Sequence, residues 1–590
     1  MIFGRTINRY YLKHAPMLLL GVLALFVVDY AQLLVPEFYR MVIDGMEDGF
    51  VNTAEGLIRF DLAFLLDRIC LPLIFVILVL VVGRFAWRIC IFGSAIKVEA
   101  ELRSKMFERS RFLSQQYYQV NKVGNMMSLF TNDLETVQDS FGSGVLMFFD
   151  ALLLGSLALI KMGRMNIFLT LLSLIPMGLL LAAATVVGRV MTDKWEKRQE
   201  AFSSLSDFSQ ENFSGIAVIK AFVKEGLELL AFKKLSRENE KANVDYTKAS
   251  TLLRVIVTLL VESVICIILG YGGYLVYVGT FDAARLVEFI GYFMTIVWPI
   301  MAISELIEMS SRAKASLGRI EELLEAEEDV KDREGVKEPE PIRGDIEFRN
   351  LTFRHPGAEY TALKDVSFSI KAGENVGIIG KTGSGKTTIV DLLLRIYNVE
   401  DGMLFIDGND VNDIPIRTVR RYSAYVPQDN FLFSDTIENN IAFAADEASR
   451  ESVIQAAKLS DIHSNIVEFP LGYETVLGER GVTVSGGQKQ RISIARAIMK
   501  DASILILDDS VSAVDTATER VILDNLRENR KGKTTILIAH RISTVEQMDK
   551  IIFIDEGRVV AVGTHGELVS TVPEYKNMVD LQKLEEKEGA

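Results

Sequence analysis

The residues best suited to do chemistry form a glycine-rich loop with the pattern GxxxxGK[ST]. The loop consists of Gly380, Lys381, Thr382, Gly383, Ser384, Gly385, Lys386 and Thr387. Its glycines allow the backbone to curl, so that the N–H groups point inward at phosphate oxygens. Lys386 can reach the outer phosphates, and the Thr387 hydroxyl can bind Mg²⁺. The loop therefore predicts a site for a nucleoside triphosphate.

Two adjacent carboxylates are the second candidate for this chemistry. The apolar run 503–507 is predicted to be a buried strand, and it ends at Asp508 and Asp509. An acidic residue at such a strand end can hold Mg²⁺ through water in nucleotide sites. Two acids at a strand end could also form a solvated turn, but the phosphate loop in the same chain favours a role in catalysis.

A sheet and its helices must position these residues. Residues 345–353 and 366–370 alternate like strands, and the apolar run 374–380 leads straight into the loop. A helix predicted at about residues 388–397 begins at Thr388 and directs the positive end of its dipole at the phosphates. The C-terminal part of the chain is therefore predicted to be an α/β P-loop nucleotide-binding domain.

A third motif lies between the loop and the carboxylates. Val484 is followed by Ser485, Gly486, Gly487 and Gln488, and a helix is predicted from about residue 489 to residue 499. Here the sequence resembles the ABC transporters, whose signature motif LSGGQ differs only at its first position. Ser-Gly-Gly at a helix N-terminus can bind phosphate through the helix dipole. The resemblance implies that this motif meets the nucleotide of the opposite subunit, so that ATP lies between two chains.

Other motifs of that family strengthen the resemblance. Gln428 resembles the Q-loop residue that touches Mg²⁺ and the membrane domain, and His540 resembles the switch histidine that contacts the γ-phosphate. Residues 512–515 resemble the D-loop, and residues 478–481 resemble the X-loop of exporters. The implied cofactors are ATP and Mg²⁺, with the ion held through ATP by Thr387, Gln428 and Asp508. The expected catalytic residues are Asp509, His540 and Gln428.

Two positions depart from the family pattern. The family has an aromatic residue, usually Tyr, that stacks on adenine, and this chain has His355 at that position. An imidazole can still stack, although with less contact area than a phenol. The family has a glutamate after Asp508 as general base, and this chain has the shorter Asp509. A general base must lie about 2.6–3.2 Å from its proton, and a misplacement of about 1 Å can cost about a hundredfold in rate.

Asp509 leads to a prediction about assembly. The same exchange of glutamate for aspartate marks one subunit of heterodimeric ABC exporters, so this chain is expected to bind ATP and hydrolyse it slowly. Its near-intact signature motif would complete the site of a different subunit that carries the glutamate. The leading interpretation is one half of a heterodimer that exports a substrate by alternating access. A homodimer, an importer with the exporter fold (as for siderophores), an ATP-gated channel and an ATP-binding scaffold are the alternatives.

The remainder of the chain has the composition of a membrane domain. Of its 590 residues 49% are hydrophobic, and most of the apolar weight precedes about residue 310. The net charge of −14 argues against a nucleic-acid partner, and the three cysteines form no metal-binding or disulfide pattern. We expect a transmembrane domain over residues 1–320, an acidic linker over 321–344 and a nucleotide-binding domain over 345–590.

Six stretches are apolar enough to be membrane-spanning helices. They are residues 17–35, 69–91, 144–161, 167–187, 255–278 and 286–303. Basic residues concentrate between the second and third stretches and between the fourth and fifth. Because Lys and Arg favour cytoplasmic loops, both termini and the nucleotide-binding domain are expected in the cytoplasm. By resemblance, the membrane is the plasma membrane of a bacterium.

The two long cytoplasmic connections, residues 97–139 and 189–251, are rich in helix formers and contain no proline. They are predicted to be helices that continue from the membrane far into the cytoplasm, because long loops without structure are uncommon. Residues 112–118, followed by Thr131, Asn132 and Asp133, resemble the first coupling region of ABC exporters. Residues 211–216 and 220–222 resemble the second. The expected fold is thus a six-span α-helical domain of the ABC exporter type, followed by the nucleotide-binding domain.

Charged residues within the spans are costly, and they usually face a partner or a wet cavity. The six such residues are Asp29, Arg84, Asp150, Arg254, Glu262 and Glu288. Structural pairing and substrate contact are equally open for each of them. Asp150 is hypothesised to face the translocation cavity, because it lies in the middle of the third span. The architecture suits small-molecule, drug, lipid or peptide cargo and does not select among them.

Overall fold

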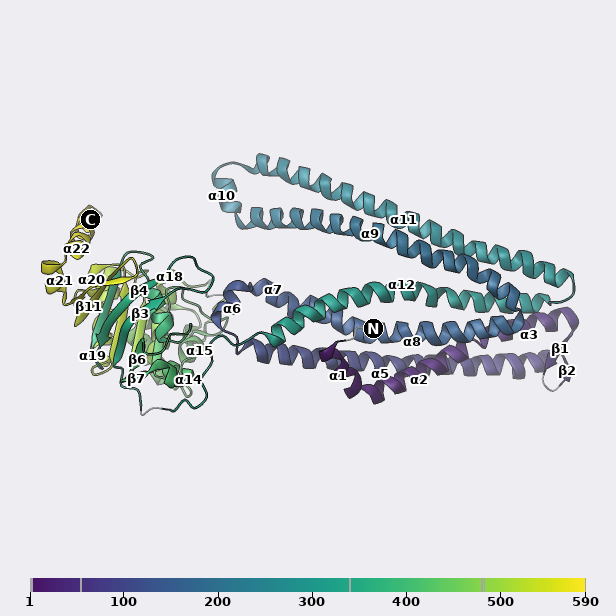
Figure 1. The fold of residues 1–590 in the computed structure, drawn as a ribbon, viewed down its shortest axis with the longest axis horizontal. Helices are drawn as coiled ribbons and strands as arrows, with labels where there is room; N and C mark the ends of the chain where they lie inside the picture. Colours follow the sequence, from purple (N-terminus) through teal and green to yellow (C-terminus); the bar gives the residue numbers. More distant parts are fainter. Residues whose placement is uncertain (1–3, 54–55, 339–340, 479–480, 482, 589–590) are drawn as a thin grey trace. The chain divides into compact units, whose positions relative to one another are not determined.

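The computed structural model describes residues 4–53, 56–338, 341–478, 481 and 483–588. The chain forms two compact units, each with a core of its own (Figure 1). The helical unit comprises Met1–Arg111 and Val123–Ala326, and the sheet unit comprises Phe112–Lys122 and Glu327–Ala590. The chain therefore leaves the helical unit for a short segment, contributes that segment to the sheet unit, and returns.

The helical unit is built mainly from seven helices in its described residues. They are α2 (Ala15–Gln32), α3 (Val35–Asp48), α5 (Leu71–Ser110), α8 (Leu134–Met165), α9 (Ile167–Ser214), α11 (Glu225–Tyr277) and α12 (Ala283–Glu325). Shorter elements are α1 (Arg5–Lys13), α4 (Leu62–Phe64), α7 (Val123–Ser128), α10 (Ile216–Ala221) and two π-helices, Leu65–Cys70 and Leu129–Asp133. Five helical stretches are long and apolar enough to cross a membrane, and α9 begins with a shorter apolar stretch, Ile167–Leu179. The first predicted span, residues 17–35, is interrupted by a turn between α2 and α3, and the other five fall on helical stretches to within one residue.

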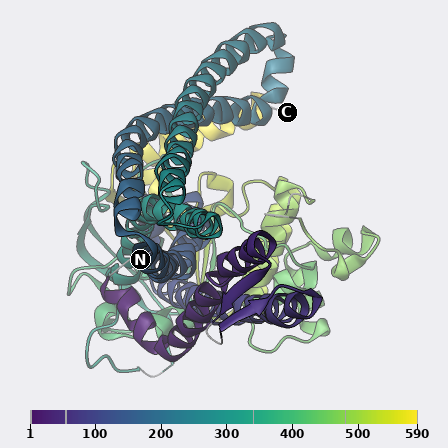
Figure 2. The ribbon, with the colours of Figure 1, turned by 90° about the vertical axis from the view of Figure 1, so that its right-hand side faces the viewer.

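The predicted helical extensions are present. α9 has 48 residues and α11 has 53, so at about 1.5 Å per residue each is roughly 70–80 Å long. That length is more than twice the hydrocarbon thickness of a bilayer, about 30 Å. α9 and α11 lie side by side, with α10 at the tip of the pair, and they diverge from the bundle of α2, α5, α8 and α12 (Figures 1 and 2). We call this pair, with α10, the arm.

A small β-hairpin between α3 and α4 was not predicted from the sequence. It consists of β1 (Phe50–Thr53) and β2 (Gly56–Arg59), which pair antiparallel. Val51 packs with Phe64 and Ile69 in a small apolar cluster. Gly45 of α3 lies directly beneath Phe60, and a Cβ atom at Gly45 would come within 2.1 Å of the ring. The hairpin can approach the helix this closely because the position is a glycine.

The sheet unit contains a six-stranded sheet with the strand order β12-β11-β5-β10-β9-β8. β11, β5, β10, β9 and β8 run parallel, and β12 is an antiparallel edge strand. Their bounds are β5 Asn375–Gly380, β8 Ser423–Val426, β9 Ile504–Asp508, β10 Thr534–Ala539, β11 Lys550–Asp555 and β12 Arg558–Gly563. A second, antiparallel sheet has the order β4-β3-β6-β7, with β3 Ile346–Phe353, β4 Leu363–Ile370, β6 Leu404–Ile406 and β7 Asn409–Asp410.

Among the described residues, the apolar side chains of this unit form three clusters, and in one of them Ile379, Leu505 and Leu537 of the six-stranded sheet pack with Ile522, Leu526 and Tyr575. α13 (Lys386–Leu393) packs its apolar side chains into a core that both sheets share. α18 (Gly486–Met499) packs against α15 (Ile437–Ala442) and α16 (Arg450–Leu459) in another cluster. The other helices are α6 Gln115–Val120, α14 Ile416–Arg421, α17 His463–Glu468, α19 Thr516–Asn529, α20 Ile542–Val545, α21 His565–Thr571 and α22 Pro573–Glu588.

Helix boundaries differ from the expected ones at four places, one of which is the end of α13 at Leu393 rather than near residue 397. α13 begins at Lys386 rather than at Thr388, so the loop lysine already belongs to the helix. α18 begins at Gly486 rather than near residue 489. α12 continues through Glu325, so the first five residues of the expected linker are helical. Arg109 Nε donates to the carbonyl of Ala326 (3.1 Å) and ties down the end of α12.

Candidate functional site

The phosphate loop turns sharply at the end of β5, which lies between β11 and β10 in the parallel sheet. Gly383 and Gly385 have φ values of 80° and 96°, in the left-handed region that favours glycine. A Cβ atom at Gly380 would lie 2.0 Å from the carbonyl oxygen of Ile554. The loop can take this path only with glycine at these positions, and it brings Thr387 and Thr388 to the start of α13.

Lys386 lies inside the loop and is only 6% exposed. Its Nζ donates to the carbonyl oxygens of Gly380 (2.9 Å) and Lys381 (2.8 Å). Burial lowers the pKa of Lys386, and the nearby charges of Asp508 and Asp509 oppose that shift. The ammonium group is thus held where phosphate oxygens would replace the two carbonyls as its partners. Lys381 differs, because it is exposed and pairs with Asp555 (3.3 Å).

Asp508 ends β9 and is 1% exposed. Its side chain is hydrogen-bonded to Thr387, which favours the ionised carboxylate, but burial dominates and raises the pKa of Asp508. No partner reaches its Oδ2 atom within the described part of the chain. A hydroxyl beside a carboxylate with an unused oxygen suits Mg²⁺, which binds oxygen ligands together with substrate phosphates. Thr387 and Asp508 therefore fit the ion that the sequence implies.

The backbone of Asp509 is fixed on both sides. Its φ is 46°, which is uncommon for a residue other than glycine. Its N–H donates to the carbonyl of Ile538 (2.9 Å), and its own carbonyl accepts from the Ser512 hydroxyl (2.9 Å). A shift of the backbone toward the phosphate loop would break these bonds. The missing methylene of Asp509 is therefore not compensated by the main chain.

His540 follows β10 and lies close enough to Asp508 to act on the pKa of that carboxyl group. Its carbonyl accepts a hydrogen bond from Gln582 Nε2 (2.7 Å), and Gln582 Oε1 accepts from the N–H of Ile542 (2.7 Å). One side chain of α22 thus holds the segment on both sides of Arg541. Sequence reasoning missed Gln582, because nothing local to it indicates a contact forty residues away.

His355 lies beside the start of α13, on the loop after β3. Its Nε2 is 3.2 Å from the Thr388 hydroxyl, and burial lowers the pKa of the imidazole. Its ring meets those of Phe353 and Tyr397 edge to face, with centroids 5.0 Å and 5.1 Å apart. The imidazole is therefore oriented by three neighbours beside the start of α13.

Residues 112–118 of the expected first coupling region belong to the sheet unit, whereas Thr131, Asn132 and Asp133 belong to the helical unit. Tyr397, which contacts His355, donates its hydroxyl hydrogen to Gln119 Oε1 of α6 (3.1 Å). Ser114 donates to Asp329 (3.0 Å) at the other end of the segment. Tyr397 therefore touches both the expected adenine side chain and the coupling segment, a connection that the sequence did not reveal.

The signature residues lie at the N-terminus of α18. Ser485 caps the helix, and the Ser485 and Gln488 side chains bond to each other's backbone N–H groups (3.3 and 3.0 Å). A Cβ atom at Gly487 would lie 3.0 Å from the carbonyl oxygen of Ala513. The backbone N–H of Ala513 donates to Gln490 Oε1 (3.0 Å). Gln428 is exposed, two residues beyond β8. In the expected X-loop, Glu479 and Arg480 lie outside the described residues.

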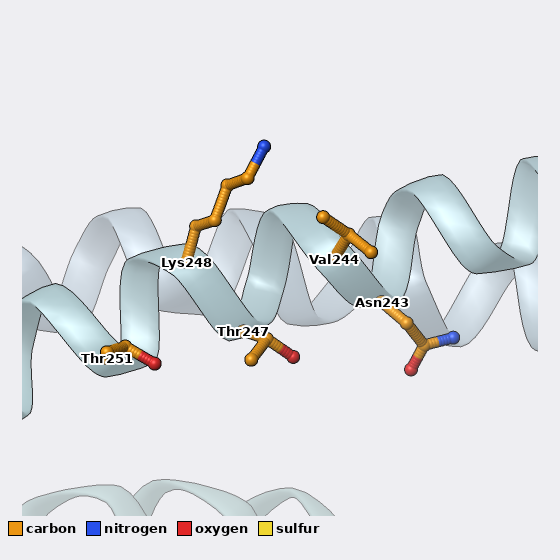
Figure 3. A pocket seen from close by; sticks show the side chains of 5 residues that line it. All are labelled: Asn243, Val244, Thr247, Lys248 and Thr251. Carbon is orange, nitrogen blue, oxygen red and sulfur yellow. The ribbon is translucent and has the colours of Figure 1, made fainter.

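Charged groups of the helical unit also find partners. Glu288 accepts a hydrogen bond from Tyr292 (2.8 Å) and pairs with Arg40 (3.4 Å), which supports the structural alternative for that residue. Asp150 accepts a hydrogen bond from Trp298 Nε1 (2.6 Å). A pocket on α11 contains none of the predicted site residues; its lining side chains are Asn243, Val244, Thr247, Lys248 and Thr251 (Figure 3).

Comparisons with known proteins agree with this arrangement. The ABC transporter family matches residues 363–512, and the ABC transporter transmembrane region matches residues 18–300. The chain is 36% identical to the probable multidrug resistance ABC transporter ATP-binding/permease protein YheI of Bacillus subtilis, over 98% of this chain and 97% of that protein. It is 32% identical to the multidrug resistance-like ATP-binding protein MdlA of Escherichia coli, over 96% and 94% of the two chains.

A solved structure extends the likeness to three dimensions. The structure of a bacterial Atm1-family ABC exporter with ATP bound matches with a TM-score of 0.76, at 25% identity and over 98% of each chain. The predicted fold class is confirmed by this match and by the two family matches. The chain belongs to the ABC transporters, as an exporter-type protein with fused membrane and ATP-binding domains, and it is an ATPase coupled to transport across a membrane.

Proposed function

We propose that this chain is the slowly hydrolysing half of a heterodimeric exporter for drug-like molecules in a bacterial plasma membrane. ABC exporters function as dimers, and the multidrug names of the relatives at 36% and 32% identity support this class of cargo. The observation that carries the proposal is Asp509, which stands where the general base of the family is a glutamate. The domain boundaries at about residues 320 and 345 and the cytoplasmic termini are part of this proposal.

The ATP site of this chain retains its binding groups. Lys386 would leave the carbonyls of Gly380 and Lys381 for the outer phosphates, and His355 would cover the adenine ring. Thr387 and Asp508, with Gln428, would hold Mg²⁺, which when bound neutralises charge that develops on the phosphates. His540 would contact the γ-phosphate, on a segment held by Gln582. Binding of ATP is therefore expected to be intact.

Hydrolysis at the same site is expected to be slow. The aspartate side chain is one methylene shorter than glutamate, so its oxygens lie about 1 Å farther from the attacking water, enough to cost about a hundredfold. The N–H of Asp509 is bonded to Ile538, so the backbone does not make up this distance. ATP would stay bound at this site while the other site of the dimer hydrolyses ATP repeatedly.

The signature motif of this chain is equipped to complete the site of a partner. The first N–H groups of a helix have no partner within the helix, so those of Gly486 and Gly487 are available to a phosphate group. Ser485 and Gln488 fix the helix start by their reciprocal bonds. A partner that carries the glutamate would then contain the rapidly hydrolysing ATP site. The signature motif of this chain would complete that site.

The arm supports assembly with a second subunit. α10, at the tip of the arm, has no buried residue. The residues on either side of it include Phe213 and Phe222, whose side chains are 76% and 71% exposed. Large exposed aromatic side chains at one end of an element indicate a surface that contacts another protein rather than solvent alone. In this proposal they are the second coupling region and dock on the partner.

The test is the rate of ATP hydrolysis by the purified chain, alone and together with its partner subunit. We expect slow turnover from the chain alone and rapid turnover from the pair. Replacing the partner's glutamate with glutamine should abolish the rapid rate, whereas Asp509→Asn should leave most of it. Rapid hydrolysis by the chain alone would instead establish a homodimer in which Asp509 is a sufficient base.

A further inference from the structure

The last described helix, α22, is fixed to the six-stranded sheet. Its residues Tyr575 and Val579 are 0% and 3% exposed, and they belong to an apolar cluster that includes side chains of that sheet. The ring of Tyr575 meets that of Phe553 of β11 edge to face, with centroids 5.7 Å apart. Gln582 lies seven residues after Tyr575 and three after Val579, a spacing that places all three on one face of a helix. Gln582 is therefore carried by the packed face of α22.

Gln582 joins this helix to the segment that follows β10. Its Nε2 donates to the carbonyl of His540 (2.7 Å), and its Oε1 accepts from the N–H of Ile542 (2.7 Å). Ile542 is the first residue of α20, and the side chain of the preceding Arg541 makes no capping bond. Because the first N–H groups of a helix have no partner within it, Gln582 supplies the acceptor that a capping side chain would otherwise supply. The amide group thereby fixes the backbone from which the imidazole of His540 projects.

The far end of this segment has an anchor of its own. Thr544 of α20 donates its hydroxyl hydrogen to Glu519 of α19, a residue that is 4% exposed. The other carboxyl oxygen of Glu519 lies 3.9 Å from Arg541. Burial raises the pKa of Glu519, and the bond from Thr544 and the charge of Arg541 oppose that shift. Loss of the Gln582 bonds would therefore release the end of the segment that carries His540, while Thr544 stays tied to α19.

We propose that Gln582 is a positioning residue for recognition of the γ-phosphate, and that through His540 it sets how strongly this site prefers ATP to ADP. ADP has no γ-phosphate, so a contact made by His540 adds to the binding of ATP alone. Apparent affinity falls in proportion to the fraction of the protein whose binding groups are in place. A segment without its anchor spends less time in that arrangement, so ATP loses affinity and ADP keeps it. This inference rests on the γ-phosphate contact of His540 in the function proposed above.

The test measures the affinity of this chain's own site for the two nucleotides. The full chain is assembled with its partner subunit in lipid nanodiscs with Mg²⁺, kept on ice to suppress turnover, and labelled with a photoreactive azido derivative of ATP. Displacement of the label by ATP or by ADP gives a Kd for each, and the label on this chain is read after electrophoresis separates the subunits. The ATP preference is the ratio of the Kd for ADP to the Kd for ATP.

We expect Gln582→Met, which keeps the side-chain length and removes the amide, to lower the ATP preference about fivefold or more. Each hydrogen bond of this kind contributes about a factor of five to an equilibrium. Gln582→Glu keeps the acceptor for Ile542 and loses the donor to His540, so its ATP preference should lie between those of the wild type and Gln582→Met. If Gln582→Met does not assemble, Gln582→Glu decides in the same way.

Two comparisons make the outcome decisive. Gln547→Met removes an exposed amide close to the same segment, one that is bonded to Arg527 of α19 (3.1 Å), and it should leave the ATP preference unchanged. His540→Ala should lower the preference at least as far as Gln582→Met. Adding Gln582→Met to His540→Ala should lower it no further, because residues that act through one contact are not additive.

Three results would overturn the inference. Equal weakening of ATP and ADP in Gln582→Met would show a loss of stability alone, and a further fall in the double variant would show that Gln582 does not act through His540. An unchanged preference in Gln582→Met, beside a lowered one in His540→Ala, would remove the role of Gln582 and leave the γ-phosphate contact standing. An unchanged preference in His540→Ala would contradict that contact itself, and the inference with it.

Discussion

At the scale of single residues, Asp509 and His355 are two positions where the sequence predicts a functional departure from the family pattern, and the structure holds the two residues differently. Asp509 is held by backbone bonds to a neighbouring strand, so its side-chain length sets the distance to the attacking water. The ring of His355 is held by side-chain contacts with Thr388, Phe353 and Tyr397, and burial lowers its pKa. The first departure is expected to affect the rate of hydrolysis, and the second the binding of ATP.

The length of the side chain at position 509 can be restored by mutation. In the assembled pair with the partner's glutamate changed to glutamine, Asp509→Glu should raise phosphate release by about ten- to a hundredfold, because the carboxylate regains about 1 Å of reach. Asp509→Asn is the matched control and should stay at the background rate. An unchanged rate in Asp509→Glu would show that something other than side-chain length limits this site.

His355 predicts that ATP binds more weakly in acid. Burial lowers the pKa of this imidazole below its usual value of about 6.5, so the neutral ring is the favoured form, and covering it with adenine favours that form further. Protonation therefore competes with ATP as the pH falls. Between pH 7.5 and 5.5 the Kd for ATP should rise several-fold more in the wild type than in His355→Tyr. The titration of ATP itself affects both proteins equally, so the difference between their Kd values reports on the imidazole. Equal dependence of the two Kd values on pH would contradict the argument.

At the scale of elements, the hydroxyl group of Tyr397 joins α6 to the ATP-binding part of the chain. Tyr397→Phe removes the bond to Gln119 and keeps the ring contact with His355. A hydrogen bond of this kind contributes about 1 kcal/mol, roughly fivefold in an equilibrium. We expect ATP affinity to be unchanged and the stimulation of hydrolysis by cargo to fall several-fold. Tyr360→Phe, an exposed tyrosine on the loop after β3, is the control; equal stimulation in both variants would contradict the link.

The elements that could be predicted from the sequence are those specified by neighbouring residues. The phosphate loop, the signature turn and the long helices each depend on a local pattern of glycines, caps or apolar side chains. The hairpin between α3 and α4 has no comparable pattern, because its strands are four residues long and gain stability by packing on Phe64 and Ile69. The partners Gln119, Gln582 and Trp298 were not predictable either, since their contacts join segments that are distant in sequence.

At the scale of the whole molecule, the arm ends in exposed aromatic side chains that belong to neither core. If they dock on a second subunit, Phe213→Ser and Phe222→Ser should abolish cargo-stimulated hydrolysis by the assembled pair and leave ATP binding intact, because the apolar contact area is lost. Phe202→Ser is the control, since Phe202 is exposed on the shaft of α9. Normal stimulation in the tip variants would show that the tip makes no contact needed for coupling.

The segment Phe112–Lys122 is made long before the domain to which it belongs. The ribosome synthesises it early, and then most of the membrane helices follow before Glu327 begins the rest of the sheet unit. Synthesis proceeds at about 5–20 residues per second. The segment is therefore complete well before the surface that it docks on, and the helices between them insert into the bilayer in the meantime. Contacts that span so much sequence form late and slowly. Docking of Gln119 against Tyr397 is thus a closing step of biogenesis, and a chain truncated within the sheet unit would leave the segment without its surface.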